Sequence, residues 1–259
     1  MENKRDLAVL IGLLLTDGCV TTKWKISFIN KSEILHGIFR EKIGSLFGKR
    51  EFTEVFNKNG VKRTEVNSKR IVEFLTQFTP TFRTRAFPNG ELPNARIPEF
   101  FFQLSEKELE DVLRVMFSTD GSVILRIKWR KDKKKWELVR EIRFFSKHPA
   151  IRRDFASLLK KLGFSPSVKS DRVILTKKKD LIKFAKEIRF VDGVKVTQTG
   201  MWSGMEKNRV LDILEKTFEL RLCTFSREIF PSKKDVMDFL LSLSADPAGS
   251  VGRLTGRTD

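Results

Sequence analysis

Apolar residues recur along this chain at two different spacings, and the two spacings alternate in the same order twice. Near the N-terminus the apolar positions lie on one face of a helix, namely Leu7, Leu10, Ile11, Leu14 and Leu15. Residues 20–30 and 123–146 instead carry β-prone side chains largely at alternate positions, which is typical of strands. The pattern therefore predicts a helix followed by paired strands in each half of the chain.

Three segments of the first half reappear in the second half. Residues 10–18 (LIGLLLTDG) match residues 113–121 (LRVMFSTDG), so two apolar helices are expected to end in Thr-Asp-Gly. Two further matches follow, 25–34 with 141–151 and 70–74 with 180–184. Because all three keep the same order, they indicate an internal duplication with insertions and deletions in the hairpins.

Each half is expected to run helix, two strands, helix, two strands, helix, which is a mixed α+β fold. The second helices begin at Ser32 and Pro149, residue types that favour the N-cap and N1 positions. The further strands are expected at residues 51–56, 62–67, 167–169 and 172–176. Ser105 and Glu108 form a capping box ahead of the second apolar helix.

Proline and glycine interrupt residues 87–98, which are the expected linker between the halves. Additional helices are expected near the C-terminus, over residues 200–218 and 232–243. We place the N-terminal half at 1–92, the end of the linker at 93–100, the C-terminal half with its extra helices at 101–243, and a disordered tail at 244–259.

The composition excludes several classes of site. The chain has two cysteines and two histidines, too few for a disulfide framework or a zinc site of the usual spacing. His36 and His148 are therefore assigned to surface or capping roles. No apolar stretch is long enough to span a bilayer, and no signal peptide is recognised. We expect an intracellular protein, in the cytoplasm or nucleoid of a prokaryote such as an archaeon, or in an organelle.

The charge points to a polyanionic partner. Lys and Arg number 51 against 33 Asp and Glu, a net charge of +18. The excess is clustered: residues 22–25, 58–64 and above all 126–140 bracket predicted hairpin turns. Such cationic β-ribbons suit contact with phosphates and major-groove base edges. Trp129 and Trp136, within the densest cluster, are expected to pack against each other across the hairpin.

With two copies of an apolar helix ending in Thr-Asp-Gly in a basic, duplicated chain, residues 5–190 resemble a LAGLIDADG homing endonuclease of the single-chain, two-motif form. The resemblance implies antiparallel β-saddles around two closely packed motif helices. Gly12 suits that close packing, whereas Val115 at the matching position departs from the family's preference for small residues.

The two aspartates are the expected metal ligands. A carboxylate at a helix C-terminus is disfavoured by the helix dipole, so Asp17 and Asp120 are easier to explain if a divalent cation neutralises them. The expected ion is Mg²⁺, with Mn²⁺ or Ca²⁺ as substitutes, and two or three ions at the pair. By resemblance, the backbone carbonyls of Thr16 and Thr119 add ligands, and Lys31 and Lys147 are catalytic lysines.

The remaining candidates are DNA contacts from the strands, the hairpins and the segments after the last helix of each half. They are Thr22, Lys23, Lys25, Asn30, Lys62, Arg63, Arg83, Arg85, Arg126, Lys128, Arg130, Arg140, Arg143, Ser146, Lys169, Arg172 and Lys195.

The resemblance implies a monomeric, site-specific endonuclease that cuts both strands of a long asymmetric DNA site and leaves short 3′ overhangs. It needs no protein partner and no membrane. Two alternatives stay open: an intron-encoded maturase that binds group I intron RNA, and a DNA-binding regulator that keeps the fold without cleaving.

Overall fold

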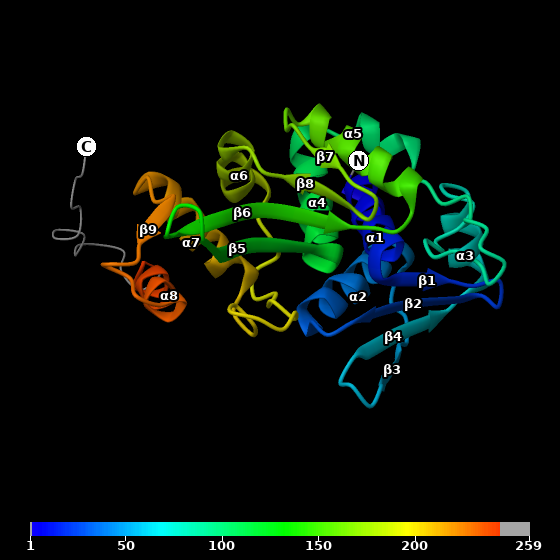
Figure 1. Cartoon of the computed structure of the whole chain (residues 1–259). Helices are drawn as coiled ribbons and strands as arrows, with labels where there is room; N and C mark the ends of the chain where they lie inside the picture. Colours follow the sequence, from blue (N-terminus) through cyan, green and yellow to red (C-terminus); the bar gives the residue numbers. More distant parts are fainter. Residues whose placement is uncertain (1, 244–259) are drawn as a thin grey trace.

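Two helices lie side by side at the centre of the molecule, α1 (Glu2–Asp17) and α4 (Glu106–Asp120), and these are the two helices that end in Thr-Asp-Gly. The computed structural model describes residues 2–243, with side chains from residue 4. Each central helix leads directly into an antiparallel sheet with its own covering helices (Figure 1). The predicted α+β fold is confirmed.

The elements follow the predicted order in both halves. After α1 the first half contains β1 (Gly18–Val20), β2 (Lys25–Asn30), α2 (Glu33–Phe47), β3 (Thr53–Phe56), β4 (Lys62–Asn67) and α3 (Lys69–Thr76). Around α4 the second half contains η1 (Glu99–Gln103), β5 (Gly121–Arg130), β6 (Lys135–Phe145), α5 (Pro149–Lys161), β7 (Ser167–Val168), β8 (Arg172–Leu175), α6 (Lys178–Lys183) and η2 (Phe184–Ile188). A C-terminal extension adds α7 (Lys207–Glu219), β9 (Thr224–Ser226) and α8 (Lys233–Ser242).

The two sheets have the same strand order. The first runs β1-β2-β4-β3 and the second β5-β6-β8-β7, all antiparallel, with β9 added to β6. The register agrees as well, because Gly18 pairs with Phe28 in the first sheet and Gly121 pairs with Phe144 in the second. Equal order and register confirm the duplication.

Alternation along the strands separates two faces of each sheet. Ile26 and Phe28 in one sheet, and Ile142 and Phe144 in the other, are fully buried on the side that the helices cover. The rings of Phe144 and Phe155 stack with centroids 3.7 Å apart, which fixes α5 against β6. The opposite side of each sheet, here called the open face, carries most of the polar strand residues.

The junction from each central helix to its sheet requires glycine. A Cβ atom at Gly18 would lie 2.4 Å from the Leu14 Cα atom, and one at Gly121 would lie 2.4 Å from the Phe117 carbonyl oxygen. Gly12 serves a different purpose, since a Cβ atom there would lie 3.0 Å from Met116 Cγ of the partner helix. Val115, at the matching position of α4, is 6% exposed. The central helices thus approach closely through a glycine on α1 only.

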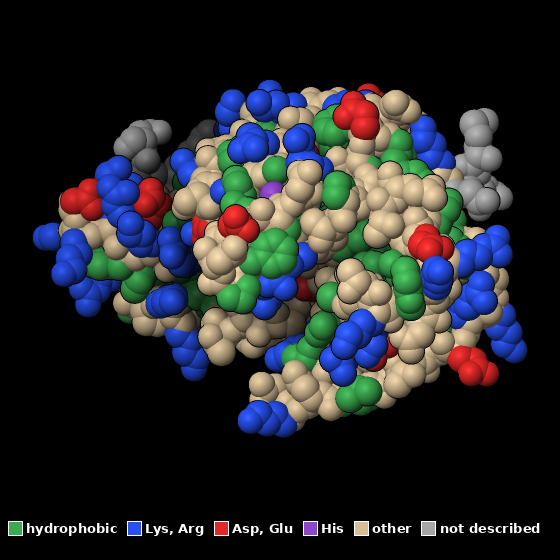
Figure 2. All heavy atoms as spheres, turned by 90° about the vertical axis from the view of Figure 1, so that its right-hand side faces the viewer, with side chains coloured by type: hydrophobic (Ala, Val, Ile, Leu, Met, Phe, Trp, Pro, Cys, Tyr) green, Lys and Arg blue, Asp and Glu red, His purple; other side chains and the backbone are tan. Residues whose placement is uncertain are grey.

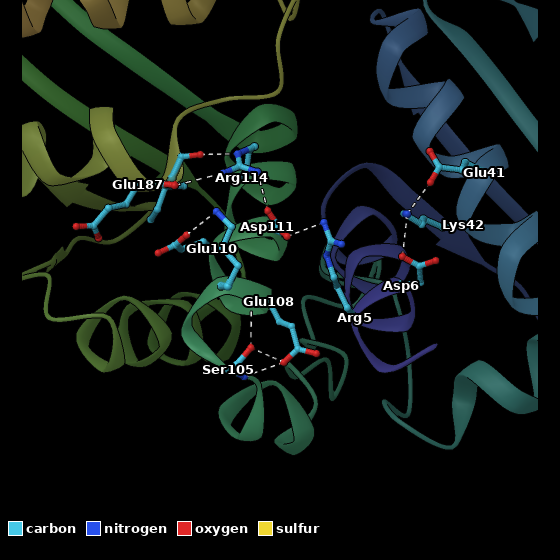
Figure 3. A network of polar contacts seen from close by, with 12 residues as sticks. Arg5, Asp6, Glu41, Lys42, Ser105, Glu108, Glu110, Asp111, Arg114 and Glu187 are labelled. Atoms are coloured by element: carbon cyan, nitrogen blue, oxygen red, sulfur yellow. Dashed lines mark hydrogen bonds and ion pairs between the residues drawn. The ribbon is translucent and has the colours of Figure 1, made fainter. Parts of the chain in front are cut away.

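An ion-pair network fastens the N-terminal halves of the central helices (Figure 3). Arg5 of α1 contacts Asp111 of α4 at 2.6 Å, and Asp111 also accepts from Arg114 at 2.6 Å. Arg114 Nε then donates to the Ile188 carbonyl at 2.6 Å. The network therefore joins α1, α4 and η2.

The linker is held by buried polar side chains of the second half. Asp154 accepts two hydrogen bonds from Arg96, at 2.7 and 2.8 Å, and one from the Ile97 amide at 3.2 Å. His148 Nε2 lies 2.7 Å from the Pro93 carbonyl, while its Nδ1 caps α5. His148 is a cap as predicted, but it is buried. His36 is fully buried, so its assignment to a surface or cap was wrong.

Two further predictions concern the C-terminal segment. The helix expected from residue 200 begins at Lys207, because residues 194–206 form turns in which Val196 N donates to Met205 O and Gly204 N to Val196 O. The helix expected at 232–243 is α8, and its Ser232–Asp235 capping box is present, as is that of Ser105 and Glu108. The predicted tail at 244–259 lies outside the described residues. No described helix is long and apolar enough to cross a membrane.

Gly121→Ala tests the steric constraint at the helix–sheet junction. Its Cβ atom would meet backbone rather than a flexible side chain, so we expect the free energy of unfolding to fall by about 1–3 kcal/mol. Gly44→Ala is the control, since it lies inside α2 with nothing within 4 Å of the added atom. That change should raise the unfolding free energy by about 0.5–1 kcal/mol. Urea unfolding measures both, and equal effects would contradict the assignment.

Candidate active site

Asp17 and Asp120 come together because each is the last residue of a central helix. Burial raises the pKa of Asp120 to about 8, and the nearby negative charge of Asp17 contributes to that shift. Burial also raises the pKa of Asp17, although a hydrogen bond from Asn30 opposes it. Two adjacent, poorly hydrated carboxylates therefore share one site and would both be stabilised by a cation.

Asn30 orients the first carboxylate. Its Nδ2 donates to Asp17 Oδ2 at 2.6 Å, and its Oδ1 accepts from the Ser32 amide at 2.7 Å, which fixes the direction of the side-chain amide. Its backbone carbonyl lies 3.1 Å from Nε2 of the buried His36. Burial lowers the pKa of His36, so the neutral ring donates through Nε2 and accepts from Thr64 Oγ1 at 2.8 Å through Nδ1.

The second half holds its matching strand end differently. The Ser146 carbonyl, which corresponds to that of Asn30, accepts from Arg152 Nη1 at 2.6 Å. Ser146 Oγ accepts from the His148 amide at 3.3 Å instead of contacting Asp120. The same backbone position is thus fixed in both halves, but only Asp17 receives a hydrogen bond from its strand end.

Lys207 is a site residue that the sequence did not reveal. The ammonium of this buried side chain donates to the carbonyls of Ser118 at 2.8 Å and Gly121 at 2.7 Å, on either side of Asp120. Burial lowers its pKa to about 8, although the charges of Asp17 and Asp120 oppose the shift. A lysine at the start of a helix has no distinctive sequence signal, so only the fold places it here.

Three of the predicted basic residues lie near the aspartates. The positive charge of Arg85 lowers the pKa of both Asp17 and Asp120. Lys31 and Lys195 line a pocket of about 500 Å³ together with Thr119 and Lys207. These side chains join the candidate site through elements that are distant in sequence.

Two other basic residues predicted for the active site, Lys147 and Arg83, do not join it in the structure. Lys147 is exposed after the end of β6 and does not line the pocket that contains Lys31. Arg83 donates to the carbonyls of Arg85 at 3.0 Å and Ala86 at 2.9 Å, so its guanidinium shapes its own loop.

The donor set suits a hard divalent cation. The hydroxyls of Thr16 and Thr119 are occupied by bonds to helix carbonyls, whereas the carbonyls of both residues lie in the last turns, where no helical amide follows. Ser122 Oγ, two residues after Asp120, is buried without a protein partner. Within residues 2–243 no three His, Cys, Asp or Glu side chains cluster, so water and phosphate oxygens would complete an octahedral shell, as Mg²⁺ prefers.

The open face of the two sheets is basic, and most of its cations are paired with acids. Lys25 and Arg63 both contact Glu65 at 3.1 Å, and Arg143 contacts Glu141 at 2.5 Å. The other open-face cations are Arg126, Lys128, Arg130, Lys135 and Arg172. Arg126 and Lys128 are exposed without an ion pair among the described residues. Lys and Arg also greatly outnumber Asp and Glu on the end of the molecule shown in Figure 2.

Two candidate DNA contacts lie on the helix-covered side instead. Lys62 is held between Glu33 at 2.7 Å and Glu54 at 2.6 Å. The Arg140 guanidinium lies 4.2 Å from the centre of the Phe218 ring of α7. The remaining candidates, Thr22, Lys23 and Lys169, lie in exposed or half-exposed turns between strands.

The pair of Trp rings behaves as predicted. Trp129 and Trp136 are directly opposite each other in the β5–β6 hairpin, with ring centroids 4.8 Å apart. Both lie on the side of the hairpin away from Arg126 and Lys128, because they alternate with those residues.

The chain resembles one known family and several solved structures. Residues 108–189 match the family described as LAGLIDADG-like domain. The solved structure of I-DmoI in complex with DNA and Mn is 16% identical, covering 72% of this chain and 97% of that chain with a TM-score of 0.48. I-DmoI with DNA and Ca is 15% identical, covering 73% and 91%, also at 0.48. The N-terminal LAGLIDADG domain of DUF199/WhiA is 14% identical, covering 72% and 83%, at 0.44. No curated protein matches the sequence.

The shifted pKa values predict how stability depends on pH without metal. Asp120 keeps its proton up to about pH 8 when folded but loses it near 3.8 when unfolded. The folded state therefore binds more protons between these values, and the free energy of unfolding falls as pH rises from about 4 to 8. Lys207 titrates near 8 when folded and near 10.5 when unfolded, so its contribution rises above pH 8.

Urea unfolding in EDTA between pH 5 and 9 checks this dependence. Asp120→Asn should be more stable than the parent protein at pH 8. Its free energy of unfolding should fall much less than that of the parent protein as the pH rises to 8. Glu219→Gln removes an exposed acid at the end of α7 and should leave the pH profile unchanged. An unaltered profile in Asp120→Asn would show that this carboxyl titrates normally.

Proposed function

We propose that this chain is a homing endonuclease that cuts both strands of a long DNA site. Residues 108–189 match a LAGLIDADG-like domain, and residues 2–76 repeat its architecture. The observation that carries the proposal is the meeting of Asp17 and Asp120 with a buried lysine at the ends of two packed helices. The flanking open faces supply the cations that double-stranded DNA needs.

The carboxylates have a role that DNA binding alone would not require. A surface that only held phosphate would be weakened by two negative charges at its centre. A divalent ion bound there would lower the pKa of a water and neutralise charge on the leaving oxygen. Asp17, oriented by Asn30, and Asp120, flanked by the contacts of Lys207, would hold the metal, with the carbonyls of Thr16 and Thr119.

Lys207 and the exposed cations would act on the phosphate itself. An ammonium has three donors, and two of those of Lys207 are used by the carbonyls of Ser118 and Gly121. The third remains for a phosphate oxygen or a water in the site. Arg85 acts on both aspartates, so its charge would stabilise negative charge that develops between them. Lys31 and Lys195 would bind the phosphates that enter the pocket they line.

The proposed DNA contacts are the open-face and turn residues. They are Thr22, Lys23, Lys25, Arg63, Arg126, Lys128, Arg130, Arg143, Lys169 and Arg172. Arg126 and Lys128, which have no ion pair within the described part of the chain, would contact phosphates directly. The cations paired with Glu65 and Glu141 are held in fixed directions, which suits recognition of base edges. We propose that one chain suffices, because it contains both halves of the site.

Single carboxylate substitutions test the assignment. A cleavable target is first selected from a plasmid library of random duplexes in Mg²⁺, and Asp17→Asn and Asp120→Asn are then compared with the parent protein on it. Each variant should lose double-strand cleavage by at least a hundredfold and at most nick one strand, because each removes the acid of one half. Agarose gels of supercoiled, nicked and linear plasmid report the outcome.

Metal binding gives a second measurement that needs no target. Mn²⁺ titration calorimetry should show affinity at least tenfold weaker in both variants than in the parent protein. Glu106→Gln, at the exposed start of α4, is the control and should match the parent in both assays. Cleavage by both aspartate variants at the parental rate would exclude the proposed role, and DNA binding without cleavage by the parent would favour a non-cleaving regulator.

A further inference from the structure

The C-terminal extension builds a second basic surface, at the tip of the β5–β6 hairpin. The matched family domain ends at residue 189, and β9 and α8 lie beyond it (Figure 1). Strand β9 pairs with the start of β6, where Phe225 lies opposite Trp136. Trp136 Nε1 donates to the Phe230 carbonyl at 3.0 Å, so the extension is tied to the side of the hairpin that carries both Trp rings.

Two hollows flank a ridge on this surface. Trp129 and Arg227 line both hollows, and this shared wall is called the ridge; the guanidinium lies 5.7 Å from the centre of the indole ring. One hollow, of about 630 Å³, is also lined by Lys131 and Lys134. The other, of about 410 Å³, is also lined by Lys233.

The cations of this surface are available for a ligand. Lys131, Lys134, Arg227 and Lys233 are all exposed, and none forms an ion pair within residues 2–243. The acids nearby do not neutralise these cations. Asp132 pairs with Arg130 at 3.1 Å, and Glu228 is the one acid among the residues that line the larger hollow. The open-face cations, in contrast, mostly have carboxylate partners. An unneutralised cluster beside an aromatic ring predicts a ligand with both negative charge and planar apolar surface.

We propose that this hairpin-tip cluster, Trp129, Lys131, Lys134, Arg227 and Lys233, binds single-stranded nucleic acid. An unpaired strand offers phosphates at regular spacing and bases whose faces can pack on an indole, which duplex DNA keeps stacked inside. A chain crossing the ridge would place a base against Trp129 and phosphates on the lysines of either hollow. Trp129 lies on the side of the hairpin opposite Arg126 and Lys128. Lys131 and Lys134 lie in the turn between β5 and β6, and Arg227 and Lys233 belong to the extension, so the cluster lies beside the proposed duplex surface.

The test measures binding without cleavage and is therefore independent of the proposed nuclease. Fluorescein-labelled U12 and dT12 are titrated with protein in EDTA, and anisotropy is followed from 50 to 300 mM salt. Arg227→Ser should weaken binding at least tenfold, as should Trp129→Leu through loss of stacking. Lys131→Ser combined with Lys134→Ser should also reduce the slope of log affinity against log salt by about 1.4, since each phosphate contact on a single strand contributes about 0.7.

A matched control removes the same charge elsewhere. Lys179→Ser combined with Lys186→Ser alters two exposed lysines of α6 and η2 and should change affinity less than twofold. The tighter of the two oligonucleotides identifies RNA or DNA as the source of the strand. The proposal is overturned if neither binds or if the tip variants bind like the control. The proposal is equally overturned if a 12-base-pair duplex binds as tightly as the single strands and the same variants lose that duplex binding.

Discussion

Close packing of α1 against α4 is the constraint on which the rest of the molecule depends. Two carboxylates at helix C-termini oppose the helix dipoles, repel each other and lose hydration when buried. The structure compensates with Asn30 on Asp17, with the charge of Lys207 beside Asp120, and with Arg85 acting on both. Gly18 and Gly121 let each central helix lead directly into its sheet, so the two aspartates lie where the helices meet the sheets.

Repetition made the fold and the aspartates predictable, because the two copies of Thr-Asp-Gly mark the same structural position twice. Lys207 was missed since its contacts with Ser118 and Gly121 join distant segments, and no second copy of it exists to compare. Arg140 and Lys62 were chosen for their charge in basic hairpins. Strand alternation alone would have excluded them, as Arg140 shares its face with Leu138 and Ile142, and Lys62 with Thr64 and Val66.

The halves retain one geometry while their chemistry has diverged. The carbonyl at the end of the second strand is fixed by the neutral ring of His36 in one half and by the Arg152 guanidinium in the other. Only the first half places an amide on its aspartate, and only the second receives a lysine from outside the repeat. The two carboxylates are therefore unequal, and the halves of a DNA target would meet different electrostatic environments.

The C-terminal extension explains part of that inequality, because this one segment contributes to both the aspartate site and the tip of the β5–β6 hairpin. The first residue of α7 is Lys207, beside Asp120, whereas the end of the same helix packs Phe218 against Arg140 of β6. From there the chain continues to β9 and α8 at the hairpin tip. A deletion of the extension would remove the buried lysine, uncover the hairpin and take Arg227 and Lys233 from the tip cluster together. Only point substitutions can separate a role in the site from a role at the tip.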